Sequence, residues 1–177
     1  MSGSDKLPKS RIIPSVITSA NLLFGFLSIL WAMEGYMDEA AGFILLSVVM
    51  DTLDGKMARK LSASSDFGKE LDSLSDLVSF GVAPAVLAYA SGMYLKIGYG
   101  GVVIAALFVL CGAIRLARYN TMNVSSYFVG VPITFAGGFI ALLMLFYKMI
   151  PWYVIPVCML ILSFLMVSRL RVNRFGK

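Results

Sequence analysis

The chain has 177 residues, of which 59% are apolar and only 14% are charged, and its mean hydropathy is +0.84. Soluble domains are about 45 to 50% apolar and about 25% charged, so this composition predicts a membrane protein. The sequence has no histidine, which excludes Ser-His-Asp catalysis and histidine-ligated metals. Its two cysteines, Cys111 and Cys158, are too few for a four-thiolate zinc or iron–sulfur site. Any chemistry must therefore depend on carboxylates.

Long uncharged segments follow one another along the chain. A helix that crosses a bilayer needs about 20 predominantly apolar residues. The uncharged runs that come close to or exceed this length are residues 12–33, 77–95, 97–114, 119–147 and 149–168. A further run, residues 40–50, reaches it only by continuing into the charged segment that begins at Asp51. We therefore predict an all-α integral membrane protein with six transmembrane helices, organised as a single domain over residues 1–177.

The basic residues predict the orientation. Residues 1–13 carry Lys6, Lys9 and Arg11 and are expected to lie as a short interfacial segment at the level of the headgroups. With six spans, every lysine and arginine except Lys96 and Lys148 falls on the same side as the two termini. The positive-inside rule then places both termini in the cytoplasm of a multi-pass cell-membrane protein. Topology and anionic lipid explain the net charge of +5, without a nucleic-acid partner.

Four aspartates are spaced so that they form two helical stripes. Asp51, Asp54, Gly55, Ala58 and Arg59 stand at i, i+3, i+4, i+7 and i+8, and Gly68, Asp72 and Asp76 stand at i, i+4 and i+8. The segment between the stripes, residues 61–66, is rich in turn and N-cap residues. We expect helices 2 and 3 to form an antiparallel hairpin in which the two acidic stripes face each other.

Such a cluster of carboxylates needs a compensating positive charge, because ionised groups inside a membrane span are costly. Oxygen ligands alone favour a hard cation, Mg²⁺ or Mn²⁺, with Ca²⁺ as a further option. Four aspartates suffice for two ions, the usual arrangement for in-line phosphoryl displacement. Gly55, Ala58 and Gly68 are small enough to leave room for a diphosphate, and Arg59 offers a phosphate contact. The alternative is a structural network of salt bridges with neighbouring lysines and Arg59.

The acidic segment resembles a known signature. Residues 51–76 reproduce the pattern D-x-x-D-G-x-x-A-R-x8-G-x3-D-x3-D of the CDP-alcohol phosphatidyltransferases at every fixed position. This resemblance implies a membrane enzyme that uses a second alcohol to displace CMP from a CDP-alcohol, with two metal ions at the cytoplasmic face. It also implies a homodimer.

The same resemblance implies a role for each site residue. The metal ligands would be Asp51, Asp54, Asp72 and Asp76, and Asp76 would also be the catalytic base. The residues that would contact the CDP-lipid are Pro14, Thr18, Asn21, Gly55, Ala58, Arg59 and Ser65. Ser15 departs from the family, in which an asparagine often follows the proline.

Two later segments, residues 113–120 and 128–132, are similar to the phosphatidylserine synthase branch of that family. The similarity implies L-serine as acceptor and CDP-diacylglycerol, or an ether-lipid analogue, as donor. Arg115 and Arg118 would bind the serine carboxylate and Asn120 would assist. The alternative for the two arginines is a positive-inside anchor at a cytoplasmic helix end.

Two other functions stay open from the sequence. Glycerol 3-phosphate or an inositol phosphate would also suit the two arginines, since each carries a phosphate. Outside the family, acidic residues in a span are found in cation transporters. The acids here are confined to one hairpin and no second copy of it follows, whereas transporters are often built from repeats.

Overall fold

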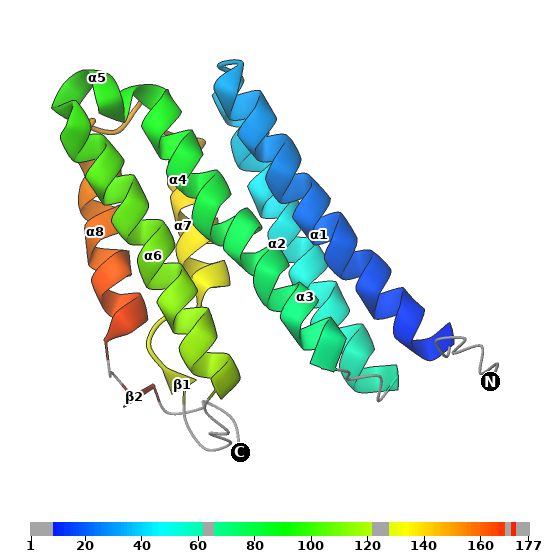
Figure 1. Ribbon diagram of the computed structural model, residues 1–177. Helices are drawn as coiled ribbons and strands as arrows, with labels where there is room; N and C mark the ends of the chain where they lie inside the picture. Colours follow the sequence, from blue (N-terminus) through cyan, green and yellow to red (C-terminus); the bar gives the residue numbers. More distant parts are fainter. Residues whose placement is uncertain (1–8, 62–65, 122–127, 169–170, 173–177) are drawn as a thin grey trace, which may run out of the picture.

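The structure is a computed structural model that describes residues 9–61, 66–121, 128–168 and 171–172. Its helices are α1 (Lys9–Met33), α2 (Met37–Leu61), α3 (Asp66–Asp76), α4 (Ala83–Ala88), α5 (Tyr94–Ile97), α6 (Tyr99–Thr121), α7 (Ile133–Met144) and α8 (Val154–Val167), shown in Figure 1. Two π-helical segments, η1 (Leu77–Val82) and η2 (Tyr89–Met93), join α3, α4 and α5. Two short strands, β1 (Phe128–Val129) and β2 (Arg171–Val172), pair antiparallel. The described residues are thus almost entirely helical.

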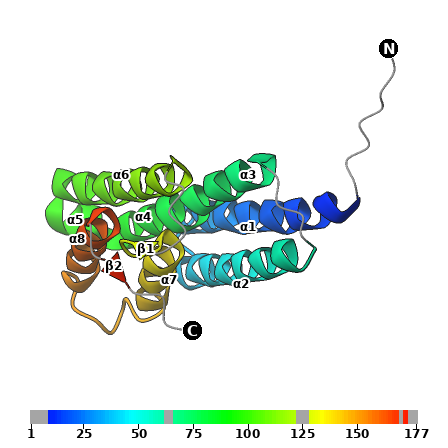
Figure 2. The ribbon, with the colours of Figure 1, turned by 90° about the horizontal axis from the view of Figure 1, so that it is seen from below.

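The helix α1 packs against both helices that carry the signature aspartates, α2 and α3. It runs antiparallel to α2 after a tight turn in which Gly35 has φ +89°. It also packs against α3, so that α1 lies between α2 and α3 in Figure 2. Small buried residues, Ala32, Ala40 and Ala41, allow α1 and α2 to approach closely, and Ser28 Oγ donates to the Ala40 carbonyl at 2.8 Å. The two acidic helices therefore share one rigid neighbour.

The helix α7 borders the same region from the other side, since it packs against α2 and η1. Gly137 of α7 lies directly against the backbone of Phe80 in η1, and a Cβ atom at Gly137 would overlap it. Helices α6 and α8 pack together on the far side of α7 (Figure 1). Close packing at Gly137 holds the first turn of α7 near the acidic helices.

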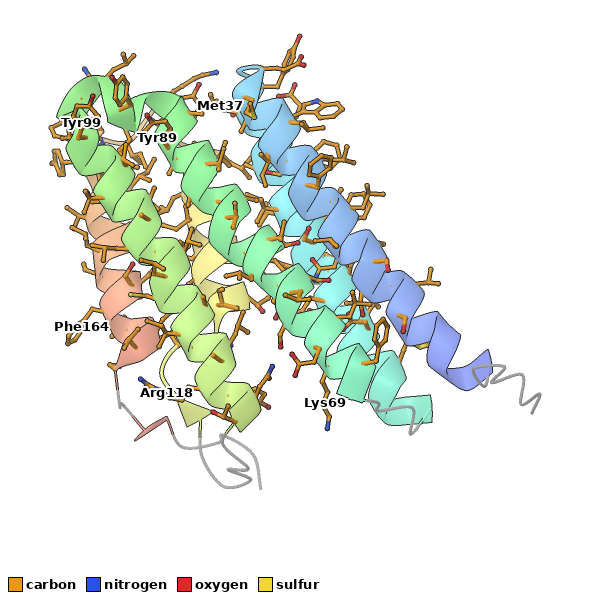
Figure 3. The ribbon with its side chains drawn as sticks, viewed as in Figure 1. Met37, Lys69, Tyr89, Tyr99, Arg118 and Phe164 are labelled. Carbon is orange, nitrogen blue, oxygen red and sulfur yellow. The ribbon has the colours of Figure 1, made fainter. Side chains whose placement is uncertain are left out.

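Three helical segments are long and apolar enough to cross a membrane: Ser15–Met33, Phe67–Ile97 and Tyr99–Thr121. The apolar helices α7 and α8 are shorter, and α2 carries the charged residues that follow residue 50. Large apolar side chains such as Phe26, Leu110 and Phe164 are exposed, and Phe164 points outward in Figure 3. A lipid-facing surface has this character, so the expected all-α integral membrane fold is confirmed. The count of six spans stays a prediction.

Two helix boundaries differ from the pattern of uncharged residues. The run 119–147 holds the end of α6 and, from Ile133, the whole of α7. Gly130 with φ +77° and Pro132 precede α7, and neither is favoured inside a helix. At the other end of the chain, residues 9–13 belong to α1, whereas residues 1–8 of the expected interfacial segment lie outside the described residues. Charge alone therefore does not locate these helix ends.

Candidate functional site

Three of the four signature aspartates come together where α2 faces α3. One carboxylate oxygen from each of Asp51, Asp72 and Asp76 lies within 4.8 Å of the other two. Asp76 is 8% exposed, and the other two are of intermediate exposure. The expectation that the two acidic stripes face each other is confirmed for this carboxylate trio, Asp51, Asp72 and Asp76. The two helices reach this arrangement by packing on α1 more than on each other.

The trio fits a hard cation. Three neighbouring carboxylates repel one another, and the repulsion is stronger in a partly buried site than in water. Asp72 Oδ1 is buried and has no hydrogen-bond partner among the described residues. A buried acceptor without a partner is costly unless a ligand completes it. The available ligands are oxygens only, which is the donor set that Mg²⁺, Mn²⁺ and Ca²⁺ prefer.

Asp54, the fourth signature aspartate, lies outside that trio. It is 6% exposed, and its Oδ2 accepts a hydrogen bond from Thr18 Oγ1 of α1 at 2.9 Å. Thr18, expected as a contact of the CDP-lipid, therefore holds an aspartate of the site in this structure. Whether Asp54 also binds metal stays a prediction.

Asn21 is fully buried and belongs to the same network. Its Nδ2 donates to Asp76 Oδ1 at 3.4 Å, and its Oδ1 has no partner among the described residues. Its backbone carbonyl accepts hydrogen bonds from Ser47 Oγ of α2 at 3.2 Å and from Ser79 Oγ of η1 at 3.0 Å. Three helical segments are thus tied to one residue of α1. Asn21, expected as a CDP-lipid contact, lies against Asp76 and orients it.

Thr134, in the first turn of α7, is a site residue that the sequence analysis missed. Its side chain hydrogen-bonds to the carboxylate of Asp51. The close packing of α7 on η1 at Gly137 sets this position. Thr134 follows the singled-out segment 128–132 by only two residues, and that proximity was the available signal.

Among the remaining expected CDP-lipid contacts, Gly55 is the one whose surroundings the structure describes. A Cβ atom built on Gly55 meets no atom within 4 Å, so there is free space beside the acidic helix at this point. Pro14 lies in α1 and Ala58 and Arg59 lie in α2, but their side chains are outside the described part of the structure. Ser65 is outside the described residues altogether.

The three expected acceptor residues, all on α6, make different contacts. Arg115 interacts electrostatically with Asp76, and its guanidinium lies 5.7 Å from the centre of the Tyr119 ring. Its buried Nε has no partner among the described residues. Arg118 instead donates from Nη1 to the Val167 carbonyl at the end of α8, at 3.0 Å.

Asn120 likewise joins two helices. Its Nδ2 donates to Ser73 Oγ of α3 at 3.0 Å. Arg118 lies at the same end of the molecule as Lys69 of α3 (Figure 3). Of the three acceptor candidates, Arg115 is therefore the one that the structure brings to the carboxylates.

Comparison with known proteins agrees with this geometry. The family model described as CDP-alcohol phosphatidyltransferase matches residues 11–168, which include the trio, Asp54, Thr18, Asn21 and Thr134. The chain belongs to the CDP-alcohol phosphatidyltransferase family. The match covers every helix described above from residue 11 onward.

Several curated members of this phosphatidyltransferase family are similar over much of the chain. The CDP-diacylglycerol–serine O-phosphatidyltransferase of Bacillus subtilis is 38% identical over 170 residues, covering 93% of this chain and 92% of the relative. The enzyme of the same name from Methanocaldococcus jannaschii is 40% identical over 167 residues, covering 92% of this chain and 74% of the relative. The archaetidylserine synthase of Methanothermobacter thermautotrophicus is 38% identical over 139 residues, covering 77% of this chain and 59% of the relative. This chain thus spans little more than half of that last relative.

Proposed function

We propose that this chain transfers the phosphatidyl group of CDP-diacylglycerol, or of an ether-lipid analogue, to the hydroxyl of L-serine, with release of CMP. The observation that carries the proposal is the carboxylate trio inside a phosphatidyltransferase fold. The choice of serine is supported by the names of relatives that match almost the whole chain. The ether-lipid analogue is kept because another relative is named archaetidylserine synthase.

The metal site of this proposal consists of Asp51, Asp54, Asp72 and Asp76, which would hold two Mg²⁺ or Mn²⁺ ions, with Ca²⁺ as a further option. The free oxygen of Asp72 and the closeness of the trio support it. Bound divalent ions would polarise the phosphoryl oxygens and neutralise charge on the departing CMP. The protein contributes a rigid frame, since Thr18 orients Asp54 and Thr134 orients Asp51.

In the proposed reaction, Asp76 acts as the general base. Its carboxylate accepts the proton of the serine hydroxyl as that oxygen forms a bond to the lipid-linked phosphorus. The phosphorus–oxygen bond to CMP breaks, and CMP leaves with the electron pair. Asn21 holds Asp76 in place through its Nδ2. Exclusion of bulk water from a base that is only 8% exposed would limit hydrolysis of the CDP-lipid.

Substrate contacts follow the same layout. Arg115 would bind the serine carboxylate beside Asp76, with Arg118 and Asn120 shaping that side of the pocket. Pro14, Ala58, Arg59 and Ser65 would contact the CDP-lipid around the free space at Gly55. Thr18 and Asn21 would act on it through Asp54 and Asp76.

The proposed setting is the cell membrane, with both termini and the site at the cytoplasmic face and the chain as a single-domain homodimer. Lys69 and Arg118 lie at one end of the bundle, and Tyr89 and Tyr99, which flank Lys96, lie at the other (Figure 3). This separation supports the orientation derived from the basic residues.

A labelled-serine assay tests this function. Purified protein in vesicles receives CDP-diacylglycerol, a divalent cation and labelled L-serine, and the expected result is labelled lipid with one CMP released per lipid formed. Parallel reactions contain glycerol 3-phosphate or an inositol phosphate. CMP release with one of these and none with serine would assign the acceptor to the alternative within the family. Cation flux into sealed vesicles without CDP-lipid would favour a transporter.

A further inference from the structure

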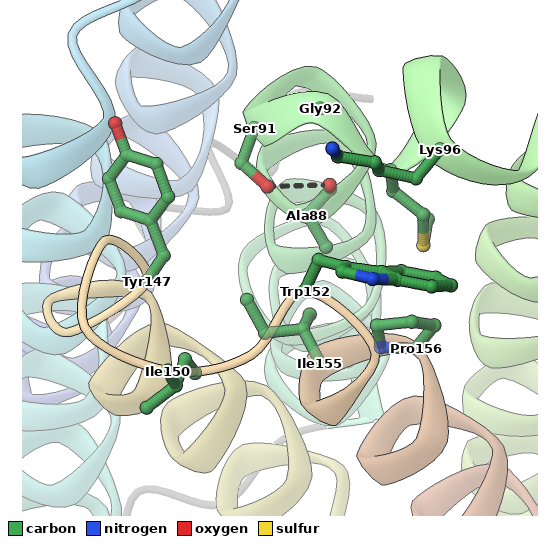
Figure 4. A pocket seen from close by; sticks show the side chains of 10 residues that line it. Ala88, Ser91, Gly92, Lys96, Tyr147, Ile150, Trp152, Ile155 and Pro156 are labelled. Atoms are coloured by element: carbon green, nitrogen blue, oxygen red, sulfur yellow. Dashed lines mark hydrogen bonds between the residues drawn. The ribbon is translucent and has the colours of Figure 1, made fainter.

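A largely apolar cavity with one lysine in its wall lies at the end of the molecule away from the carboxylates. It has a volume of about 120 Å³ and is formed by η2, α5, the segment after α7 and the start of α8 (Figure 4). Its walls include Ser91, Lys96, Tyr147, Trp152 and Pro156. None of these residues belongs to the site described above. We refer to it as the distal pocket.

The distal pocket exists because the helix breaks at its upper wall. Gly92 has φ +112°, a left-handed conformation that glycine adopts easily, so the chain turns away from the axis of α4 and returns as α5. Ser91 Oγ donates to the Ala88 carbonyl at 2.8 Å and closes this bend (Figure 4). The other wall comes from residues 147–156, which connect α7 with α8. Two segments far apart in sequence thus enclose it.

Two hydrogen-bond donors of this pocket have no partner among the described residues. The Lys96 side chain extends across the pocket towards Ser91, and the Trp152 ring forms the lower wall in Figure 4. Both side chains are exposed, and neither the Lys96 ammonium nor the indole N–H of Trp152 forms a hydrogen bond or an ion pair within the described ranges. Lys148, the other lysine of this end, is paired with Asp38 at 3.7 Å. Lys96 is therefore the one charged side chain among the residues that line the pocket, and its ammonium is available to an anion.

The surroundings of the pocket are those of a headgroup region. Tyr94, Tyr99, Trp152 and Tyr153 are all exposed around this end of the bundle. Aromatic side chains of this kind collect where the hydrocarbon core of a membrane meets its headgroups. The apolar side chains of Met93, Ile150 and Ile155 continue the pocket floor. A phospholipid in this layer would place its phosphate beside Lys96 and its acyl chains along these apolar side chains.

We propose that the distal pocket binds the phosphate of a phospholipid from the leaflet opposite the carboxylates. Lys96 pairs with the phosphate and Trp152 packs against the glycerol backbone, so that the lipid joins α5 to the segment before α8. This lipid is neither substrate nor product of the proposed reaction. The inference does not depend on which acceptor alcohol the chain uses.

Fluorescence of Trp152 tests the proposal directly. The sequence has two tryptophans, and Trp31, which packs on Phe43 in α1–α2, is removed by Trp31→Phe. Dioleoyl-phosphatidylglycerol titrated into the detergent-solubilised full chain should give a saturable change in Trp152 emission, and dioleoylglycerol should give none. Lys96→Gln should weaken the phosphatidylglycerol affinity about ten-fold, the loss of one charge-assisted hydrogen bond. Phosphatidylglycerol should also raise the Tm of the parent more than that of Lys96→Gln.

The matched control is Lys148→Gln, which removes the other described lysine of the same end; Lys148 does not line the pocket and touches it only through its contact with the Tyr147 ring, at 5.4 Å from the ring centre. It should bind phosphatidylglycerol like the parent. Equal affinities in Lys96→Gln and the parent would overturn the proposal, and so would an equal loss in both lysine variants, which would indicate surface charge alone. If inorganic phosphate changes Trp152 emission with the same affinity, the pocket binds a free anion and not a phospholipid, and the proposal is overturned.

Discussion

The two candidate binding regions of this apolar protein are built differently. At the carboxylate trio, α1, α2, α3, η1 and α7 each supply a side chain, and hydrogen bonds from Thr18, Asn21 and Thr134 fix three of the four aspartates. At the distal pocket, an ammonium and an indole lie between a helix bend and a connecting segment, with no such network. Contacts within the protein thus hold the aspartates of the first region in position, as catalysis requires. The second is an open surface site that a ligand would complete.

Metal removal should separate the two regions most strongly. Dialysis against EDTA is expected to abolish labelled-lipid formation for two reasons. Without a cation the four carboxylates repel one another, and the negative charge on the departing CMP is no longer neutralised. Activity should return with Mg²⁺ or Mn²⁺. Trp152 fluorescence titrations with phosphatidylglycerol should be unaffected by EDTA. Full activity in metal-free protein would contradict the assignment of the trio.

Asp76→Asn should lower kcat at least about 100-fold, since general-base catalysis by a positioned side chain contributes about 10² to 10⁴ and Asp76 also belongs to the trio. The control is Asp38→Asn, an aspartate at the opposite end whose partner is Lys148. It should leave kcat unchanged. The measurement is initial rate at saturating serine and CDP-diacylglycerol. A similar small loss in both variants would show that Asp76 is not the base.

The sequence predicted only part of the arrangement of the four aspartates. Spacing by itself identified Asp51, Asp72 and Asp76, because residues three, four or seven apart share a helix face whatever the helix packs against. Spacing could not show that Asp54 is hydrogen-bonded to Thr18 and lies outside the trio. That difference depends on how α1 packs against α2, which brings Thr18 to Asp54 across 36 positions of sequence.

Contacts between distant segments were equally beyond the sequence pattern. The contact of Thr134 with Asp51 joins segments more than 80 positions apart, and it requires both the break before α7 and the fit of Gly137 on Phe80. Asn21 was expected as a CDP-lipid contact, and its buried position against Asp76 follows only from three-dimensional packing. The bend at Gly92 could not be predicted from hydropathy, because residues 77–95 form one uncharged run.

Arg115→Ala should raise the KM for serine about 10- to 100-fold with a smaller effect on kcat, as expected for loss of a charged hydrogen bond of about 1.5 to 3 kcal/mol. The comparison is Arg118→Ala, whose guanidinium is engaged with the Val167 carbonyl. That variant should mainly lower the Tm. Steady-state kinetics over a range of serine concentrations distinguish the two. An unchanged serine KM in Arg115→Ala would remove it from the acceptor site.

Thr134→Val is expected to have the smallest effect, about a ten-fold weaker apparent affinity for Mn²⁺, since a residue that orients a metal ligand typically contributes 10- to 100-fold. Valine keeps the shape and removes the hydroxyl that hydrogen-bonds to Asp51. Thr134→Ser restores the hydroxyl and should restore the affinity. Metal-dependent rise in Tm provides a readout that does not require turnover. Equal affinity in valine and serine variants would make Thr134 a packing residue only.

The central claim is that the aspartates of α2 and α3 form a two-ion site. Electron paramagnetic resonance of the full-length protein titrated with Mn²⁺ tests it most directly, because it counts bound ions and detects their mutual coupling. The predicted result is two coupled Mn²⁺ ions per chain in the parent and the loss of coupling in Asp72→Asn. No tightly bound Mn²⁺ in the parent, or unchanged binding in Asp72→Asn, would contradict the account.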